Sequence, residues 1–174
     1  MMSRYRGLKF VEHIKPTFKN AKAIKSLTYQ DALAAGFENP YAIADPLSFR
    51  EALEQWMKLL RHPERYSGYT LNGELVAFIK HNALHVEGAP DQWIILGLVA
   101  SDDLHDDELE RVLKRLLMLP VENPRTGMNR TVNVAIHDND PLLEIALRYG
   151  FIPVGKPDYQ EGAPGLKQQN YQLS

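Results

Sequence analysis

The sequence contains no cysteine, and this absence removes several kinds of chemistry at once. Disulfides, thiolate zinc sites, iron–sulfur clusters and a cysteine nucleophile are all excluded. No apolar run approaches the roughly 18–20 residues that a membrane-spanning helix needs, and the polar start Met-Met-Ser-Arg-Tyr-Arg is not typical of an export signal. These features predict a soluble, cytoplasmic protein without a membrane partner.

Biased composition and a large net charge are also missing. The 174 residues include 11 Gly and 11 Pro, scattered without a period, and the formal net charge is -2. Collagen-like, low-complexity and wholly disordered classes are therefore excluded. The near-neutral charge gives no global field that would recruit nucleic acid. The length and the 44% hydrophobic content predict one compact domain.

The charges that are present are unevenly distributed along the chain. In the first 27 residues the Lys and Arg side chains face only one acidic residue, Glu12, whereas six carboxylates crowd the segment 102–110. We expect a basic N-terminal extension over residues 1–21 and a single domain over 22–174. The extension could contact an acidic partner or could simply be solvated.

Turn, capping and periodicity signals divide the domain into alternating elements. Strands are expected at 23–27, 66–71, 74–84, 92–100, 130–136, 151–154 and 166–173. Helices are expected from Thr28 to Gly36, from Ser48 to Pro63, from the acidic segment to Pro120, and from Asp140 to Gly150. This order predicts an α/β (α+β) fold with a mixed, mostly antiparallel sheet of about six to seven strands and about four helices.

Two of these elements carry more specific expectations. The second helix has an apolar stripe at the helical period, which predicts a face packed on the core: Phe49, Leu53, Trp56, Met57 and Leu60. The strand at 92–100 is apolar on both faces, as in the centre of a sheet, but is interrupted by Gly97. Glycine at such a place is typical of a bulge, or of a close approach by another backbone or a ligand.

The C-terminal third resembles a known family. The stretch Val132-Asn133-Val134-Ala135-Ile136-His137-Asp138-Asn139-Asp140, the helix after it and the segment Tyr149-Gly150-Phe151 are similar to the fifth strand, fourth helix and sixth strand of the GNAT (N-acetyltransferase) superfamily. Asn139 stands twelve residues before Phe151, the spacing usual in that superfamily. The order of elements agrees over residues 22–173.

The resemblance implies a three-layer fold and an acyl-CoA site. In such enzymes the fourth and fifth strands splay apart, and the pantetheine arm of acetyl-CoA or another acyl-CoA lies in the gap. Backbone groups near Leu98 and Val99 would then bind the cofactor, and Asn139 would contact the pantetheine or its bound waters. An ordinary apolar core strand with one glycine is the alternative interpretation.

The chain departs from the family at the loop that holds the cofactor's diphosphate. A Gly-rich segment usually precedes the third helix, so that backbone amides approach the diphosphate. Here no glycine lies between Gly97 and Gly127, and the expected positions fall near Asp107 and Leu109. The carboxylates either obstruct and repel a diphosphate or simply complement the helix N-terminus. Any acyl-CoA binding is expected to be weak.

The usual catalytic tyrosine is also replaced. Seven residues after Asn139 the chain has Ala146, and Tyr149 comes three residues later. Tyr149 is either a displaced general acid for the leaving thiolate or a packed core residue.

An amine acceptor also needs a group that removes its proton. Carboxylate and imidazole candidates near the strand gap are His81, His85, Glu87, Asp91 and His137. Among these, Glu87 and His137 are the two that we take as site residues. The run from His137 to Asp140 also suggests a metal, but no second ligand pair is present, so no metal is expected.

The sequence thus predicts an N-acyltransferase that transfers an acyl group from acyl-CoA to a primary amine by direct attack. The acceptor would be a small molecule or an amino group of a protein. A GNAT-fold binding or regulatory module without catalysis is the alternative, because the glycines and the tyrosine are missing. Whether the chain forms a homodimer stays open.

Overall fold

The computed structural model describes residues 7–36, 48–84, 87–88, 91–122, 130–159 and 167–173. A seven-stranded sheet has the order β1-β2-β3-β4-β5-β7-β6. Its strands are β1 (Leu8–Val11), β2 (Tyr66–Leu71), β3 (Glu74–Leu84), β4 (Asp91–Ala100), β5 (Arg130–His137), β6 (Ile152–Tyr159) and β7 (Lys167–Leu173). The α-helices are α1 (Phe18–Ala35), α2 (Phe49–Arg61), α3 (Asp106–Glu122) and α4 (Leu142–Arg148). Only the pair β4 and β5 is parallel among the described strands, so the predicted mixed, mostly antiparallel sheet is confirmed.

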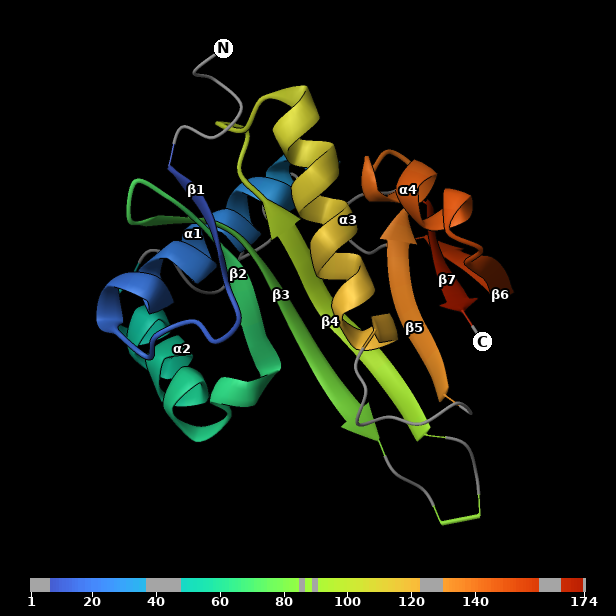
Figure 1. The fold of residues 1–174 in the computed structure, drawn as a ribbon, viewed down its shortest axis with the longest axis horizontal. Helices are drawn as coiled ribbons and strands as arrows, with labels where there is room; N and C mark the ends of the chain where they lie inside the picture. The colour runs from blue at the N-terminus through green and yellow to red at the C-terminus, as the bar shows by residue number, and fades with distance from the viewer. Residues whose placement is uncertain are drawn as a thin grey trace.

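The helices form a layer on each face of the sheet (Figure 1). On one face α3 and α4 bury residues such as Leu116 and Ile145 against the sheet. On the other face α1 and α2 contribute Ile24, Leu27 and Leu59 to a second core cluster. The result is a three-layer α/β fold, as the family resemblance implied.

Helix α1 replaces the strand predicted at 23–27, and that prediction is wrong. Ala21, Ile24 and Leu27 recur at helical spacing and are buried against the sheet. Thr17 caps the helix by accepting a hydrogen bond from the Asn20 amide at 3.1 Å. The helix starts ten residues before Thr28 and pairs the backbone hydrogen-bonding groups of the whole segment. The short apolar run at 23–27, considered alone, suggested a strand.

Part of the predicted basic extension belongs to the sheet. Residues Leu8–Val11 form β1, which pairs antiparallel with β2 from Leu8 with Leu71 to Val11 with Gly68. The sequence pattern did not predict this strand, because the strand is short and lies at the edge of the sheet, where only one side of its backbone is paired.

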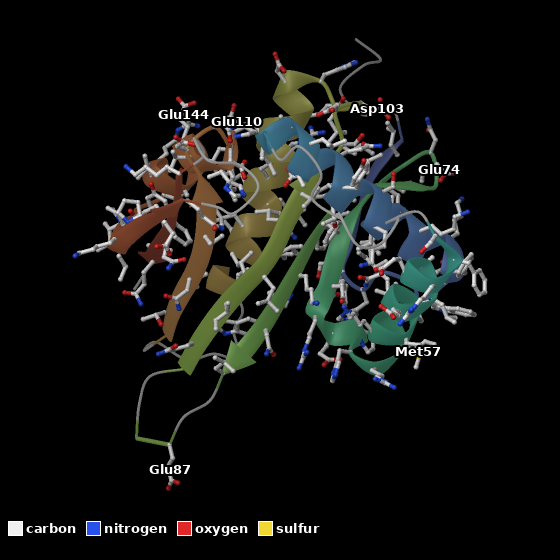
Figure 2. All side chains as sticks on the ribbon, turned by 180° about the vertical axis from the view of Figure 1, so that it is seen from behind. Met57, Glu74, Glu87, Asp103, Glu110 and Glu144 are labelled. Atoms are coloured by element: carbon white, nitrogen blue, oxygen red, sulfur yellow. The ribbon has the colours of Figure 1, made fainter. Side chains whose placement is uncertain are left out.

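The apolar stripe predicted to pack α2 on the core faces outward instead. Phe49, Leu53, Met57 and Leu60 are 37–69% exposed, and Figure 2 shows Met57 on the outer side of α2. The buried face consists of Ala52, Gln55 and Leu59. Trp56 lies between the two faces, half-buried, and its indole N–H donates to the Pro16 carbonyl at 2.7 Å. The buried face is also tied to the sheet, because the Gln55 side-chain amide donates to the hydroxyl of Tyr66 in β2 at 3.2 Å.

The remaining elements occur in the predicted order, although β6 continues five residues beyond the predicted 151–154, to Tyr159. The predicted Asn-Gly turn joins β2 and β3, with Asn72 at φ 52° and Gly73 at φ 83°. Helix α3 continues two residues past Pro120, which was expected to end it. Within the described part of the chain, no helix combines the length and the apolar character needed to cross a membrane.

Candidate active site

The ladder between β4 and β5 stops halfway along both strands. Their pairs run from Asp91 with Arg130 to Ile95 with Val134. Both strands continue, β4 to Ala100 and β5 to His137, but no further pair between them occurs in the described structure. Figure 1 shows the two strands diverging toward their carboxyl ends. This splay is the one that the resemblance implied.

A β-bulge in β4 begins the splay. Lys80 of β3 pairs with Gly97 and the next residue, His81, pairs with Ile95, so Leu96 is the extra residue. A bulge next to Gly97 was one of the two outcomes expected from the sequence. It bends β4 away from β5 while β4 remains paired with β3.

Leu98 and Val99 lie on the splayed half of β4. On the β3 side they pair with Ile79 and Phe78, and their side chains are buried. On the β5 side this stretch has no strand partner among the described residues. Backbone N–H and C=O groups are obligatory hydrogen-bonding groups, so this edge is suited to an extended ligand.

His137 ends β5 on the face of the sheet that α1 covers. Val134 and Ile136 are buried in the cluster beneath α3 and α4. Because alternate side chains point to opposite faces, Ala135 and His137 point toward the other layer. Ala135 is exposed, as is Leu96, which is 54% exposed. The α1 side of the splay is therefore open to solvent.

The turn after β5 connects this region to α1. The Asn139 side-chain amide donates to the carbonyl of Ala35 at 3.2 Å. Asp140 Oδ1 accepts from the Leu142 amide at 2.9 Å, as predicted for a residue that caps α4. Burial raises the pKa of Asp140, while the Leu142 hydrogen bond and the nearby His137 act in the opposite direction. The turn thus gathers His137, Asn139 and Asp140 beside the end of α1.

Asp31 of α1 belongs to the same region. It lies four residues after Leu27, which is buried against the sheet, so both residues are on the sheet-facing side of the helix. Burial, the negative charge of Asp140 and then that of Asp102 raise the pKa of Asp31 from 3.8 to about 6. Asp102 follows β4 and Asp140 follows β5, so Asp31 lies within electrostatic reach of the ends of both splayed strands.

The sequence did not single out Asp31, which falls in the first turn of the helix expected from Thr28 to Gly36. The signal that could have found it is a carboxylate continuing the stripe Ala21, Ile24 and Leu27. That stripe is visible only when residues 18–35 are treated as one helix. The predicted strand at 23–27 concealed it.

The start of α3, where a diphosphate was expected, is capped by the protein itself. The His105 amide donates to Glu108 Oε1 at 3.0 Å, and the Glu108 side chain is 1% exposed. This contact is the carboxylate half of a capping box. Asp106 and Asp107 are exposed on the same turn. The residues present therefore fit a pantetheine chain beside β4 better than they fit a diphosphate at this helix end.

Two predicted catalytic residues lie elsewhere. Glu87 is exposed in the connection before β4, at the opposite end of that strand from the splay, and Figure 2 shows it at the tip of the connection. Tyr149 follows α4 and packs against the core beneath α3, with Lys114 Nζ 5.2 Å from its ring centre. The structure brings neither residue together with His137.

The other proton acceptors considered from the sequence are less well placed. His81 is buried and its ring lies 5.1 Å from that of Trp93, and burial lowers its pKa. His85 lies outside the described residues, as does the side chain of Asp91. No group of three His, Cys, Asp or Glu residues able to hold a metal occurs in the part of the chain that the structure describes.

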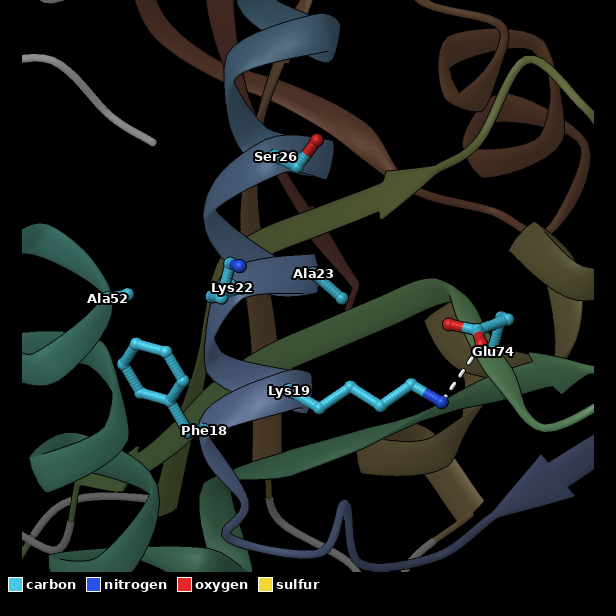
Figure 3. Close-up of a pocket in the computed structure, with 7 residues that line it drawn as sticks. All are labelled: Phe18, Lys19, Lys22, Ala23, Ser26, Ala52 and Glu74. Carbon is cyan, nitrogen blue, oxygen red and sulfur yellow. Dashed lines mark ion pairs between the residues drawn. The ribbon is translucent and has the colours of Figure 1, made fainter. Parts of the chain in front are cut away.

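A separate hollow of about 470 Å³ lies between α1 and α2 (Figure 3). Phe18 and Ala52 form part of its wall, and Lys19 pairs with Glu74 at 2.8 Å beside it. None of its lining residues belongs to β4 or β5. The hollow is therefore not part of the candidate active site.

Comparison with known proteins identifies the fold. No protein-family model matches the sequence, and no curated protein matches it. Solved structures match over nearly the whole chain. One is a chain of the NatC complex bound to Gag peptide and CoA, with 13% identity and a TM-score of 0.68 over 95% of this chain and 97% of that one. An acetyltransferase of the GNAT family from Streptococcus pneumoniae has 13% identity and a TM-score of 0.65 over 95% and 98%.

A third match is yncA from Salmonella typhimurium, a structure that contains acetyl-CoA. It has 16% identity and a TM-score of 0.59 over 95% of this chain and 92% of that one. Splayed parallel strands in a three-layer α/β domain define the class of fold. The chain has the fold of the GNAT acetyltransferases, as its sequence resemblance implied.

Proposed function

We propose that this protein is an acyl-CoA-dependent N-acyltransferase that transfers an acetyl or other acyl group to a primary amine. The observation that carries the proposal is the end of the β4–β5 ladder at Ile95 and Val134, several residues before either strand ends. An internal sheet edge left without a partner offers backbone groups to an extended ligand. The NatC and yncA structures, which contain CoA and acetyl-CoA, support acyl-CoA as that ligand.

The proposal assigns the pantetheine arm to the gap beside β4. Backbone groups around Leu98 and Val99 would hold it as an added strand does, and the Asn139 side chain would contact it from the end of β5. When bound, acyl-CoA supplies a thioester whose carbonyl carbon is open to attack by an amine. The protein would orient that carbonyl and exclude water from its α3 side, where the core is packed.

His137 is the predicted proton-transfer group that best suits this arrangement. It ends β5 on the open face of the splay, next to Asn139, and lies close enough to Asp140 to affect the pKa of that carboxyl. Glu87 and Tyr149 lie away from this face, so the proposal gives them no part in the chemistry.

A second candidate function is a GNAT-fold module that binds a ligand or partner without catalysis. The capping of α3 by Glu108, with exposed Asp106 and Asp107 beside it, favours this alternative. A helix start that is already capped and negatively charged is a poor place for a diphosphate.

Two measurements separate these functions. Isothermal titration with acetyl-CoA and, separately, CoA tests binding, and a thiol-release assay with a panel of primary amines tests turnover. The enzyme proposal expects binding and release of thiol that depends on the amine. Binding without turnover supports the module. Absence of both at millimolar acetyl-CoA overturns the enzyme proposal.

A further inference from the structure

We infer that Asp31 is a catalytic residue of the proposed reaction: its carboxylate takes the first proton from the ammonium form of a cationic amine acceptor. The inference rests on the proposed function and adds a residue and a substrate class to it. It starts from the position of Asp31 on α1 and from the side of the sheet that this helix covers.

The sheet-facing side of α1 carries Asp31 among packed residues. Ile24 and Leu27 are 3% and 7% exposed, and Asp31 follows Leu27 by four residues on that side. Burial of a charged group costs folding free energy unless an opposite charge or a hydrogen bond compensates it. In the described structure, Asp31 forms no ion pair with a Lys, Arg or His side chain. Its electrostatic neighbours are Asp140 and Asp102, which have the same charge.

The position of Asp31 also matches the splay. The hydrogen bond from Asn139 to Ala35 fixes the end of α1 beside the turn that follows β5. Asp31 lies one turn of helix before Ala35, on the face of the sheet toward which Ala135 and His137 point. An amine that approaches the splay from this open side would therefore pass Asp31 before it reaches β4.

Charge decides which form of the acceptor this arrangement binds. Asp31 from α1, Asp102 from the segment after β4 and Asp140 from the turn after β5 are carboxylates, and His137 is the imidazole beside them. Three carboxylates attract a cation and repel an anion, so the ammonium form of an amine is favoured. The pKa of Asp31, raised to about 6, makes this carboxylate a stronger base than an ordinary surface aspartate.

The proton balance of the transfer is then complete. Asp31 accepts one proton from the ammonium group, and the freed nitrogen lone pair forms the C–N bond with the thioester carbonyl carbon. The C–S bond breaks, and the second proton leaves nitrogen and reaches the departing sulfur through His137. Asp31 finally releases its proton to solvent. The sum is ammonium plus thioester giving amide, thiol and one proton.

The test compares Asp31→Asn with the unsubstituted protein and with Glu144→Gln, which removes an exposed carboxylate of α4. Thiol release is measured from pH 5 to 8.5 with acetyl-CoA and three probes: spermidine, n-butylamine and a short peptide with a free amino terminus. Binding of CoA to all three proteins is measured by titration. Because Asn has the shape of Asp, this substitution is expected to fold.

For the unsubstituted protein we expect kcat/KM to fall about tenfold per pH unit below a value near 6. Asp31→Asn should lower kcat by about 10²–10³-fold at pH 7.5 and lose this acidic limb, with an unchanged Kd for CoA. Glu144→Gln should keep both rate and profile.

An Asp31→Asn protein that keeps its rate and its acidic limb overturns the inference alone, and the proposed function stands. An unsubstituted protein that binds CoA but transfers acetyl to none of the probes overturns the inference together with the enzyme proposal and supports the binding module. A protein that does not bind CoA or acetyl-CoA overturns the proposed function itself, and the inference falls with it.

Discussion

Ile95 pairs with Val134, and this is the last pair between the two parallel strands at the centre of the sheet. Leu96, the next residue of β4, is bulged out of the ladder with β3 and is 54% exposed. Beyond this point an internal edge of the sheet has no strand partner in the described structure. The expected binding of acyl-CoA and the proposed acyl transfer both depend on what occupies that edge.

Acyl-CoA binding is expected to be weaker than micromolar, because Asp106 and Asp107 lie on the turn of α3 where a diphosphate would approach. Replacing both with Asn should tighten acetyl-CoA binding by about fivefold at low ionic strength, since each charge at a helix end contributes roughly 0.3–1 kcal/mol. Salt should reduce this difference by screening. Titration calorimetry measures it, with Glu54→Gln on α2 as the control. A submicromolar Kd for the unsubstituted protein at low salt would show that the phosphates bind elsewhere.

Asn139→Ala should reduce acetyl-CoA binding and turnover with little loss of stability. The lost hydrogen bond to Ala35 is exposed, so the free energy of unfolding should fall by only about 0.5 kcal/mol. Asn20→Ala is the matched control, because its side-chain amide donates to the Lys15 carbonyl at 3.0 Å in a similarly exposed bond. Calorimetry and thiol release compare the two. Equal activity in both variants would remove Asn139 from the site.

Asp31→Asn should make the protein more stable at pH 7.5, by about 1–3 kcal/mol, because the pKa of Asp31 rises from 3.8 to about 6 on folding. The stability that protonation of Asp31 contributes is present below pH 3.8 and is lost as the pH rises through 6. The difference between the variant and the unsubstituted protein should therefore shrink as the pH is lowered from 7.5 to 4. Urea unfolding over this range measures it. A difference that is independent of pH would contradict the raised pKa of Asp31.

Leu59→Ala and Leu60→Ala should differ strongly in stability although the residues are neighbours. Leu59 is 0% exposed, so its truncation should cost about 2–5 kcal/mol, whereas Leu60 is 55% exposed and its truncation should cost less than about 0.5 kcal/mol. Urea unfolding of both variants tests which face of α2 packs on the protein. The stripe expected from the sequence contains Leu60 but not Leu59, so it would instead require the Leu60 truncation to be the costly one.

Strong local signals made much of the fold predictable. The Asn72-Gly73 turn, the alternation in β5 and the Asp140 cap depend on neighbouring residues, and all three appear as expected. Gly97 also marked the place where β4 bulges. In these cases the local backbone preference and the tertiary structure agree.

The sequence was misleading where local patterns had two solutions. Residues 23–27 form a short apolar run in either a strand or a helix, and the cap at Thr17 and the packing on the sheet selected the helix. The α2 stripe had the right period, but the face that packs is the one with Ala52, Gln55 and Leu59, where Gln55 hydrogen-bonds the buried Tyr66.

By itself, the sequence determined the order of elements, the mixed sheet, the break at Gly97 and the lack of glycine before α3. Only the tertiary structure decided which ionisable groups meet. Asp31 and Asp140 are more than a hundred residues apart, and their electrostatic interaction arises because α1 crosses the sheet and ends beside the turn after β5. Glu87 and His137, both predicted site residues, are separated because they lie at opposite ends of parallel strands. Burial and long-range proximity raise the pKa of Asp31, and neither can be obtained from its neighbours in the chain.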